Sequence, residues 1–253
     1  EGNTTGRIKI EDPLHKFNAT ADIKANGVVL DNDSLGSYGG HFDYDNTQGL
    51  LTGKGSNADT AHRVNFDLSL FLNNKDREKE NHIGLMTYRY PVKILERFLK
   101  ELFSDLQGYI TGPVDLNGPF TDLSVTGKAK LEGAGLKVNF TQCFYRILDT
   151  DISLTPNEIN LDGIVLRDTA TGNPIYLNGL ITHQSFRNMF FDLGVSTRKK
   201  GTTGDQFNKP VLLINTTLKD NSSFYGRAYG TGSFSLTGQE DDLFMQISAI
   251  ASK

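Results

Sequence analysis

The stretch that decides the fold is residues 64–72, Val-Asn-Phe-Asp-Leu-Ser-Leu-Phe-Leu, in which apolar residues occupy every second position. Successive side chains of a β-strand point to opposite faces, so this run predicts a strand with one apolar face. Shorter runs repeat the pattern at Ile152 and Leu154, Ile159 and Leu161, Ile175 and Leu177, and Phe191, Leu193 and Val195. Because turn residues separate these runs at short intervals, we expect an all-β fold of antiparallel hairpins.

The alternating pattern is also repeated over longer distances. Gly6–Ile23 matches Gly112–Ala129 without a gap, 106 positions later, and Gly232–Ile247 shares the register of the second copy. We expect each of the three segments to form a strand, a turn and a second strand in equivalent positions. Such repetition is typical of an extended sheet that grows by adding similar units, and here it indicates an elongated, curled antiparallel sheet.

A second internal match supports duplication. Asp45 to Gly49, followed by Phe66-Asp67-Leu68, parallels Asp168 to Gly172, followed by Phe191-Asp192-Leu193. The alternative explanation is that β-hairpins resemble one another in general. The ungapped match between segments 106 positions apart favours duplication.

One segment departs from the strand pattern. Pro91–Phe103 has apolar residues at helical spacing, charged residues on the other side, and Gly108 just beyond its end. We expect one amphipathic helix within 91–107, between a first β-array at 1–90 and a second, continuous with it, at 108–253. Its apolar face would consist of Leu95, Phe98, Leu99 and Leu102. A core helix packed on the sheet and a helix on a membrane surface are both open explanations.

Composition excludes several classes of function. The net charge of −4 provides no basic field for a phosphate backbone, so we expect no nucleic-acid partner. Cys143 is the single cysteine, which rules out an internal disulfide, and none of the five histidines is spaced as a ligand pair. No motif of a catalytic elbow or phosphate loop occurs. We therefore expect no catalytic residues, no cofactor and no metal, and we interpret Cys143 as a packing residue rather than a nucleophile.

Three stretches resemble a known family. They are Val211–Asn221 with Phe224–Gly232, Leu95–Leu99 with Ser104–Gly108, and Leu177–His183 continuing to Phe191–Leu193. Together they look like the C-terminal region of TamB proteins, especially those of Bacteroidetes. The resemblance covers most of 91–253 and, more weakly, 1–90.

The resemblance implies a β-taco, a U-shaped sheet around an open apolar groove, as in AsmA-like proteins and the bridge-like lipid-transfer proteins. It implies a periplasmic segment of a longer chain anchored in the inner membrane. Family members are linked to phospholipid delivery and to outer-membrane biogenesis, as a translocation and assembly module beside an outer-membrane barrel of the Omp85 family. No catalytic residues come with the family.

These observations predict a non-enzymatic periplasmic bridge whose groove carries phospholipid acyl chains. A first alternative keeps the fold but holds outer-membrane protein clients by strand pairing, as a chaperone does in protein secretion. A second is a carbohydrate-binding or adhesin sandwich, against which the absence of Trp counts. The predicted groove lining is Ile8, Ile10, Ile23, Phe66, Leu68, Leu70, Val114, Leu116, Leu131, Ile152, Leu154, Leu177, Phe191, Leu193, Val195, Phe234 and Leu236.

Overall fold

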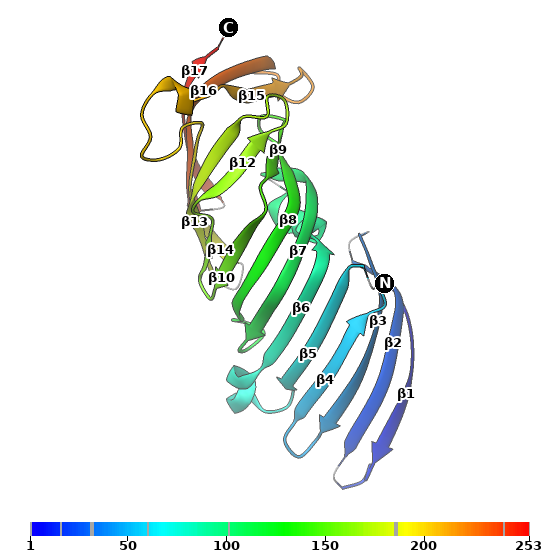
Figure 1. Ribbon diagram of the computed structural model, residues 1–253. Coiled ribbons are helices and arrows are strands. Elements are labelled where there is room, and N and C mark those ends of the chain that lie inside the picture. The colour runs from blue at the N-terminus through cyan, green and yellow to red at the C-terminus, as the bar shows by residue number, and fades with distance from the viewer. Residues whose placement is uncertain are drawn as a thin grey trace. The chain divides into compact units, whose positions relative to one another are not determined.

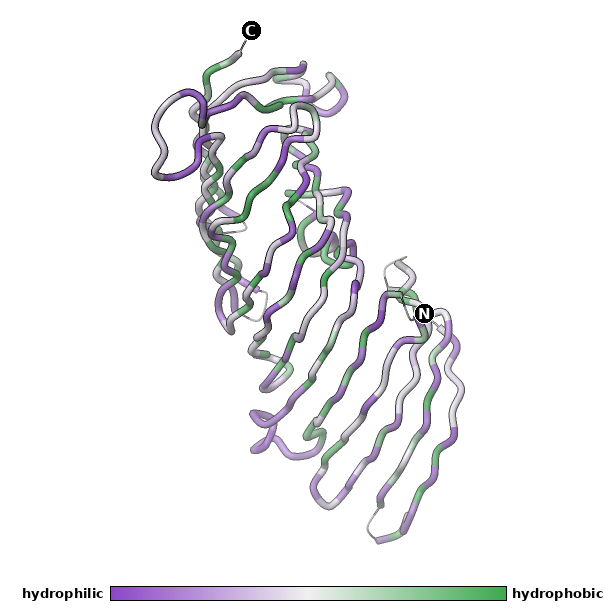
Figure 2. Tube along the Cα trace, viewed as in Figure 1, coloured by the Kyte–Doolittle hydropathy of each residue, from purple (hydrophilic) through white to green (hydrophobic). Residues whose placement is uncertain are grey.

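The computed structural model confirms the fold class. It describes residues 2–15, 17–30, 33–59, 61–100, 102–184, 187–239 and 241–252, leaving aside the side chains of Leu30, Asp33, Arg97, Phe98 and Phe207. Over these residues the chain forms one curled antiparallel sheet of 17 strands, with three 3-10 helices and one short α-helix (Figure 1). Hydropathy alternates along most strands, as the sequence predicts (Figure 2).

The elements follow one another in hairpins. The strands are β1 (Asn3–Glu11), β2 (Asn18–Leu30), β3 (Asp33–Asp45), β4 (Leu50–Asn57), β5 (Arg63–Phe71), β6 (His82–Pro91), β7 (Phe103–Asn117), β8 (Ser124–Val138), β9 (Cys143–Ile147), β10 (Thr150–Thr155), β11 (Glu158–Asn160), β12 (Ile164–Asp168), β13 (Pro174–Gln184), β14 (Arg187–Ser196), β15 (Val211–Thr216), β16 (Gly226–Gln239) and β17 (Asp242–Ala251). The helices are η1 (Lys75–Glu80), η2 (Val92–Leu95), α1 (Glu96–Leu99) and η3 (Asp205–Phe207).

The hydrogen-bonded ladders run in chain order from β1 to β9. From β9 the sheet continues through β12, β13, β14 and β16 to β17. Three shorter strands attach beside this order: β10 pairs with β8, β11 with β13, and β15 with β16. Most connections are tight turns, so most strands pair with a close neighbour in sequence.

Packing divides the chain into two compact units. Unit 1 comprises Glu1–Tyr90, Ile110–Ala129 and Leu154–Pro156, and unit 2 comprises Pro91–Tyr109, Lys130–Ser153 and Asn157–Lys253. The division runs through β7, β8 and β10, whereas the sequence suggested a helix at 91–107 as the divider between arrays at 1–90 and 108–253.

The three-fold repeat is confirmed. Each repeat is an antiparallel hairpin: β1 with β2, β7 with β8, and β16 with β17. Gly6 pairs with Ile23 and Gly232 with Ala249, and a Cβ atom on Gly112 would clash with Lys128 O and contact Ala129. A Cβ on Gly6 or Gly232 would likewise clash with the carbonyl oxygen of Asp22 or Ser248. The three glycines therefore occupy one structural position, at which the partner backbone leaves no room for a side chain.

The helix is much shorter than the predicted Pro91–Phe103. Among the described residues of this segment, only Glu96–Leu99 is α-helical; the 3-10 turn Val92–Leu95 precedes it, and β7 begins at Phe103. The reason is competition from the sheet: Asn139 N donates to Leu102 O (3.0 Å), and Leu106 N donates to the Glu96 carboxylate (3.1 Å). Strand β7, which pairs with β8, includes residues that helical spacing had assigned to the helix, because tertiary pairing overrides local propensity.

Candidate functional site

Unit 1 carries a continuous apolar face. Side chains directly opposite each other on antiparallel strands share a face, so the strand registers define rows across β1 to β6. The three central rows are Ile10-Ala19-Tyr44-Leu51-Leu70, Ile8-Ala21-Phe42-Gly53-Leu68-Ile83 and Gly6-Ile23-Gly40-Gly55-Phe66-Leu85. These rows are called the apolar face of unit 1. They contain no charged residue, and they bring together the predicted lining residues Ile8, Ile10, Ile23, Phe66, Leu68 and Leu70.

Two further predicted residues, Val114 and Leu116, lie on β7. They alternate with Asp115 and Asn117, and Asn117 Oδ1 lies 2.8 Å from Nδ1 of His82. His82 is opposite Ser69, whose side chain is on the polar side of β5. Strand alternation therefore places Val114 and Leu116 on the apolar side.

Aromatic rings cover the glycines of the apolar face. A Cβ atom on Gly40 would lie 3.0 Å from the Phe42 ring, and one on Gly53 would collide with the same ring. A Cβ on Gly55 would lie 2.5 Å from the Phe66 ring. The two rings stack with their centroids 6.1 Å apart. Because the rings occupy space that side chains would otherwise fill, the strip over β3 to β5 is a smooth aromatic surface.

The apolar face of unit 1 is exposed toward β1. The side chain of Ile8 is 64% exposed and that of Ile10 is 52% exposed, whereas Phe42, Phe66 and Leu68 are half-buried. Strands β1 to β6 form a single layer in Figure 1. A shallow depression of about 350 Å³ is lined by residues of β1, β2 and β3, among them Gly6, Ile23 and Gly40. At the end of β5 that leads to η1, the central carbon of the Arg77 guanidinium lies 4.0 Å from the centre of the Phe71 ring.

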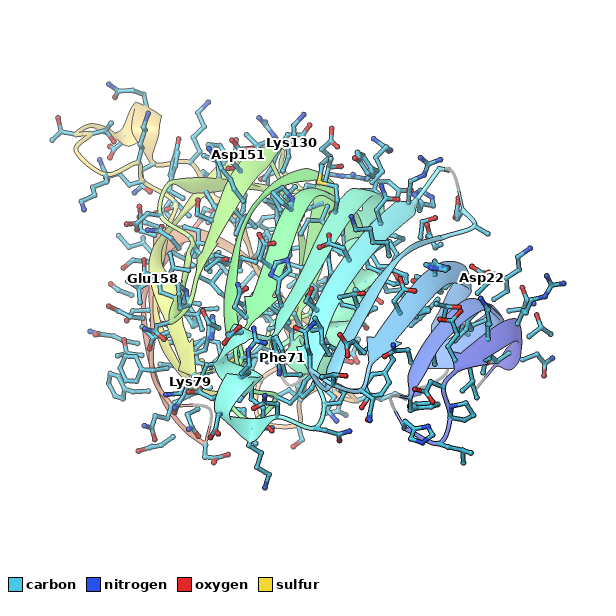
Figure 3. The ribbon with its side chains drawn as sticks, turned by 90° about the horizontal axis from the view of Figure 1, so that it is seen from below. Asp22, Phe71, Lys79, Lys130, Asp151 and Glu158 are labelled. Atoms are coloured by element: carbon cyan, nitrogen blue, oxygen red, sulfur yellow. The ribbon has the colours of Figure 1, made fainter. Side chains whose placement is uncertain are left out.

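The opposite face of unit 1 is polar. One row across it reads Arg7-Asp22-His41-Lys54-Asp67-Gly84. His41 Nδ1 lies 2.8 Å from Asp22, which stands out from β2 in Figure 3, and His41 Nε2 lies 3.4 Å from Asp43. The hydrogen bond with Asp22 and the charge of Asp43 raise the pKa of His41. The polar face is thus built for contact with water, which favours the other face as the binding surface.

Unit 2 has the same kind of apolar face, and protein covers it except along β17, where Met245 is 43% and Ile247 58% exposed. Its rows across β13, β14, β16 and β17 are Leu177-Val195-Phe234-Ile247, Gly179-Leu193-Leu236-Met245 and Ile181-Phe191-Gly238-Leu243. Phe191 is 3% exposed, Leu193 8% and Leu236 5%, and they form one core cluster with Ile181 and Met189. Leu102, Ile159 and Leu161 pack against that cluster.

A second core cluster in unit 2 contains residues of the short strand β15. Val211 and Leu212 are buried with Cys143, Tyr145 and Leu166. The register of β15 shifts between Leu212 and Ile214. The backbone N–H and C=O of Leu212 both form hydrogen bonds with side chains. Leu212 N donates to Asp168 Oδ2 (2.9 Å), and the Tyr145 hydroxyl donates to Leu212 O (2.8 Å). Burial raises the pKa of Tyr145, so its hydroxyl remains a donor.

The predicted lining residues therefore have two different environments. Those in unit 1 lie on the exposed face apart from Leu70, which is 8% exposed, whereas Leu131, Phe191, Leu193 and Leu236 are buried in protein instead of lining an open surface. Val195, Leu177 and Phe234 are half-buried beside the two clusters, and Ile152 and Leu154 are half-buried on β10. The apolar residues of β5 (Phe66, Leu68 and Leu70) and those of β14 (Phe191, Leu193 and Val195) lie in different units. That they line one continuous interior stays a prediction.

The predicted helix face is also divided. Leu95 is 41% exposed, Leu99 is half-buried, and Leu102 packs on the core cluster of unit 2. The side chain of Phe98 lies outside the part that the structure describes.

Sequence reasoning missed several members of the site. Phe42, Tyr44, Leu51 and Ile83 extend the apolar face, and the alternation of His41-Phe42-Asp43-Tyr44 was the signal that could have revealed two of them. The contacts of Leu212 with Tyr145 and Asp168 span 67 and 44 residues and had no local signal.

Within the described residues, no cluster of three or more His, Cys, Asp or Glu side chains is arranged to hold a metal ion. None of the helices in that part of the chain is long and apolar enough to cross a membrane. Comparisons with protein-family models, with curated proteins and with solved structures found no match to this chain.

Proposed function

We propose that this chain is a non-enzymatic lipid-carrying segment that holds phospholipid acyl chains on the apolar face of unit 1. The observation that carries the proposal is the uninterrupted set of apolar rows across six strands, backed by a charged opposite face. An exposed apolar surface of this extent is typical of sites for lipids or protein partners.

The chemistry of the face suits a flexible chain better than a rigid ligand. Burying each CH₂ group contributes about 0.8 kcal/mol, so an acyl chain gains affinity along its length without polar contacts. Transfer requires nearly equal binding at successive positions, because one deep site would trap the lipid. The repeated rows of Ile, Leu, Ala and Phe offer many similar positions, and the rings on Gly40, Gly53 and Gly55 keep the strip smooth.

Following the resemblance to TamB proteins, the proposal includes that this activity takes place in the periplasm of a cell with two membranes. There the segment would belong to a longer chain anchored in the inner membrane and would work beside an Omp85-family barrel. Phospholipid would pass along the sheet, and outer-membrane biogenesis would depend on it.

Site-specific photo-crosslinking tests the proposal directly. A photoreactive residue at Leu68 faces the apolar rows, and one at the adjacent Asp67 faces the polar side, so the pair differs in face but hardly in position. After irradiation in cells, mass spectrometry of the purified protein should find phospholipid attached at position 68 and little at position 67. Equal labelling at both positions would refute the proposal, and attachment of protein clients in place of lipid would favour the chaperone alternative.

A charge on the apolar face provides a second measurement. Leu68→Asp puts a carboxylate in the central row, where its desolvation opposes contact with an acyl chain. The variant should copurify with several-fold less phospholipid than the wild type, whereas Asp67→Asn, on the other face, should retain it. Circular dichroism of both variants checks that the sheet is intact.

A further inference from the structure

The polar face of unit 2 differs in chemistry from that of unit 1. The residues that alternate with its apolar rows form three neighbouring rows across β13, β14, β16 and β17, which are Tyr176-Ser196-Ser233-Ser248, Asn178-Gly194-Ser235-Gln246 and Leu180-Asp192-Thr237-Phe244. Asp192 is the one charged residue in these rows, whereas a single row of unit 1 contains Arg7, Asp22, Lys54 and Asp67. Hydroxyl and amide groups thus dominate the polar face of unit 2.

Gly194 lies in a shallow depression in the middle of this face. The depression has a volume of about 340 Å³, and its polar side chains are those of Asn178, Ser196, Ser233, Ser235, Gln246 and Ser248. A Cβ atom on Gly194 would meet nothing closer than 3.9 Å, so the glycine leaves open space above its strand. Small-ligand sites have volumes of roughly 300–1,000 Å³ and a few convergent polar groups, and this depression has both.

Most polar groups around the depression are available to a ligand. Ser196 Oγ accepts from Arg198 N (3.1 Å), but no described residue bonds to the side chains of Asn178, Ser235 or Gln246. Each of these three side chains both donates and accepts hydrogen bonds. They therefore match a ligand whose own groups do the same, as hydroxyls do. None of the three rows contains a Lys or Arg to pair with an anionic ligand.

Exposed phenylalanine rings lie beside the depression on the same face. Phe244 precedes Gln246 by two residues on β17, and Phe190 on β14 is opposite Gln239 in the next row. Phe244 is 68% exposed and Phe190 39%. The CH groups of a sugar ring make one of its faces apolar, and such a face packs on an aromatic ring. Hydroxyl and amide groups next to exposed rings are therefore suited to a carbohydrate.

A further strand beside β17 would leave this face open. Strands add in the plane of a sheet, whereas side chains project above and below it. In unit 1, Asp22 and His41 have strands on both sides, and their side chains remain 73% and 55% exposed on the polar face. The depression itself is centred on β14 and β16, which already have neighbours on both sides.

We propose that the polar face of unit 2 binds a neutral oligosaccharide over Gly194. Asn178 and Gln246 exchange hydrogen bonds with its hydroxyl groups, Asp192 accepts from a hydroxyl in the next row, and Phe244 packs on the apolar face of a sugar ring. A free oligosaccharide and the glycan of a glycolipid present the same hydroxyl chemistry. The site is in unit 2 and on the polar side of the sheet, so it is independent of lipid binding to unit 1.

NMR titration of the intact protein tests the proposal with three neutral trisaccharides: maltotriose, cellotriose and N-acetylated chitotriose. At millimolar concentration, at least one of them should shift the amide resonances of Gly194, Ser235 and Gln246. The amides of Asp22 and His41, on the polar face of unit 1, should not move. Failure of all three sugars to shift the Gly194 region would overturn the proposal, and so would equal shifts on the two polar faces.

Two glycine variants provide a matched pair. Gly194→Val fills the depression and should abolish the shifts. Gly39→Val makes the same change on the polar face of unit 1, where a Cβ likewise meets nothing closer than 3.9 Å, and should leave the Kd unchanged. Equal affinity of the two variants would refute the site. Asn178→Ala should raise the Kd by about tenfold, the equivalent of one lost hydrogen bond. Circular dichroism checks that each variant is folded.

An alkyl glycoside of the tightest-binding sugar, used below its micelle concentration, distinguishes the two sources of the glycan. Equal Kd values with and without the alkyl chain, both measured at Gly194, indicate a site for free oligosaccharide. A clearly lower Kd for the glycoside indicates a glycolipid. Shifts by the glycoside on the apolar face of unit 1 alone, with none at Gly194, would contradict the carbohydrate site while leaving the lipid proposal intact.

Discussion

Two five-residue turns with the same geometry have opposite surroundings in the two units. In Asp45–Gly49 the carboxylate of Asp45 accepts from the amides of Thr47 and Gln48, and in Asp168–Gly172 that of Asp168 accepts from Ala170 and Thr171. Both turns end on a glycine with positive φ, 64° and 75°. The hydrogen bonds of Asp45 are solvent-exposed, whereas Asp168 is fully buried and also holds Leu212 of β15.

The difference shows how one strand pattern produces two kinds of surface. In unit 1 the apolar rows continue to the exposed β1, so the face is available to a ligand. In unit 2 Leu102, Ile159 and Leu161 pack on the same kind of row, which becomes a packed core, and the bulged β15 packs on β9 and β12 in a second cluster. The alternation sets which side chains share a face, and contacts between distant segments decide whether that face is open.

The largest expected effect compares the two phenylalanines of the repeated Phe-Asp-Leu motif. Phe191→Ala should lower the free energy of unfolding by about 3–5 kcal/mol, because it leaves a cavity in a core that is already closed. Phe66→Ala should cost clearly less, since its half-buried ring lies on the open face. Denaturant titrations of both variants measure the difference. Equal losses would show that the face of unit 1 is packed like that of unit 2.

The next comparison is between the two aspartates. Asp168→Ala removes four accepted hydrogen bonds, including that from Leu212 N, and should destabilise the protein by about 1.5–3 kcal/mol. Asp45→Ala removes hydrogen bonds of a solvent-exposed turn and should lower the stability of the protein by less. Thermal unfolding of the pair is the measurement. A loss at Asp45 as large as at Asp168 would contradict the role assigned to the β15 contact.

Photo-crosslinking to phospholipid should also distinguish unit 1 from unit 2. A photoreactive residue at Leu68 should attach several-fold more phospholipid than one at Leu193, because Leu193 is 8% exposed and lies in the core cluster. Positions 67 and 192, on the polar faces, are the controls. Strong attachment at Leu193 would indicate that unit 2 opens in cells.

Thiol reactivity probes the same contrast without lipid. Burial raises the pKa of Cys143, so little thiolate is present at neutral pH, and the side chain is fully covered. A disulfide reagent should label Cys143 only in denaturant, whereas Ile8→Cys should react within minutes in the native protein. Fast labelling of the wild type would place Cys143 at the surface.

The smallest expected effect concerns two histidines. Asp22 and Asp43 raise the pKa of His41, whereas burial lowers the pKa of His183. His41 thus stabilises the fold when protonated, an effect complete below its unfolded pKa and lost as the pH rises through its folded pKa. Titration by NMR should find His41 above and His183 below the usual histidine value. Asp22→Asn should lower the pKa of His41 only.

The sequence predicted those features that depend on neighbouring residues. The alternation at 64–72 placed Phe66, Leu68 and Leu70 on one face, and the glycine register of Gly6, Gly112 and Gly232 predicted three equivalent hairpins. The end of α1 at Leu99 was not predictable in the same way, because the pairing of Leu102 with Asn139 decides it. The packing of β15 in unit 2 depends on Tyr145 and Asp168 reaching Leu212, and no local pattern encodes that contact.

The order of the ladders also sets how the chain acquires its structure during synthesis. From β1 to β6 each strand pairs with the one made just before it, so these hairpins need only short loops to close and can form one after another as the chain emerges. The contacts of Leu212 bridge 44 and 67 residues and must await nearly the whole segment. The amino-terminal strands can therefore complete their pairing before β15 is made and packs onto β9 and β12.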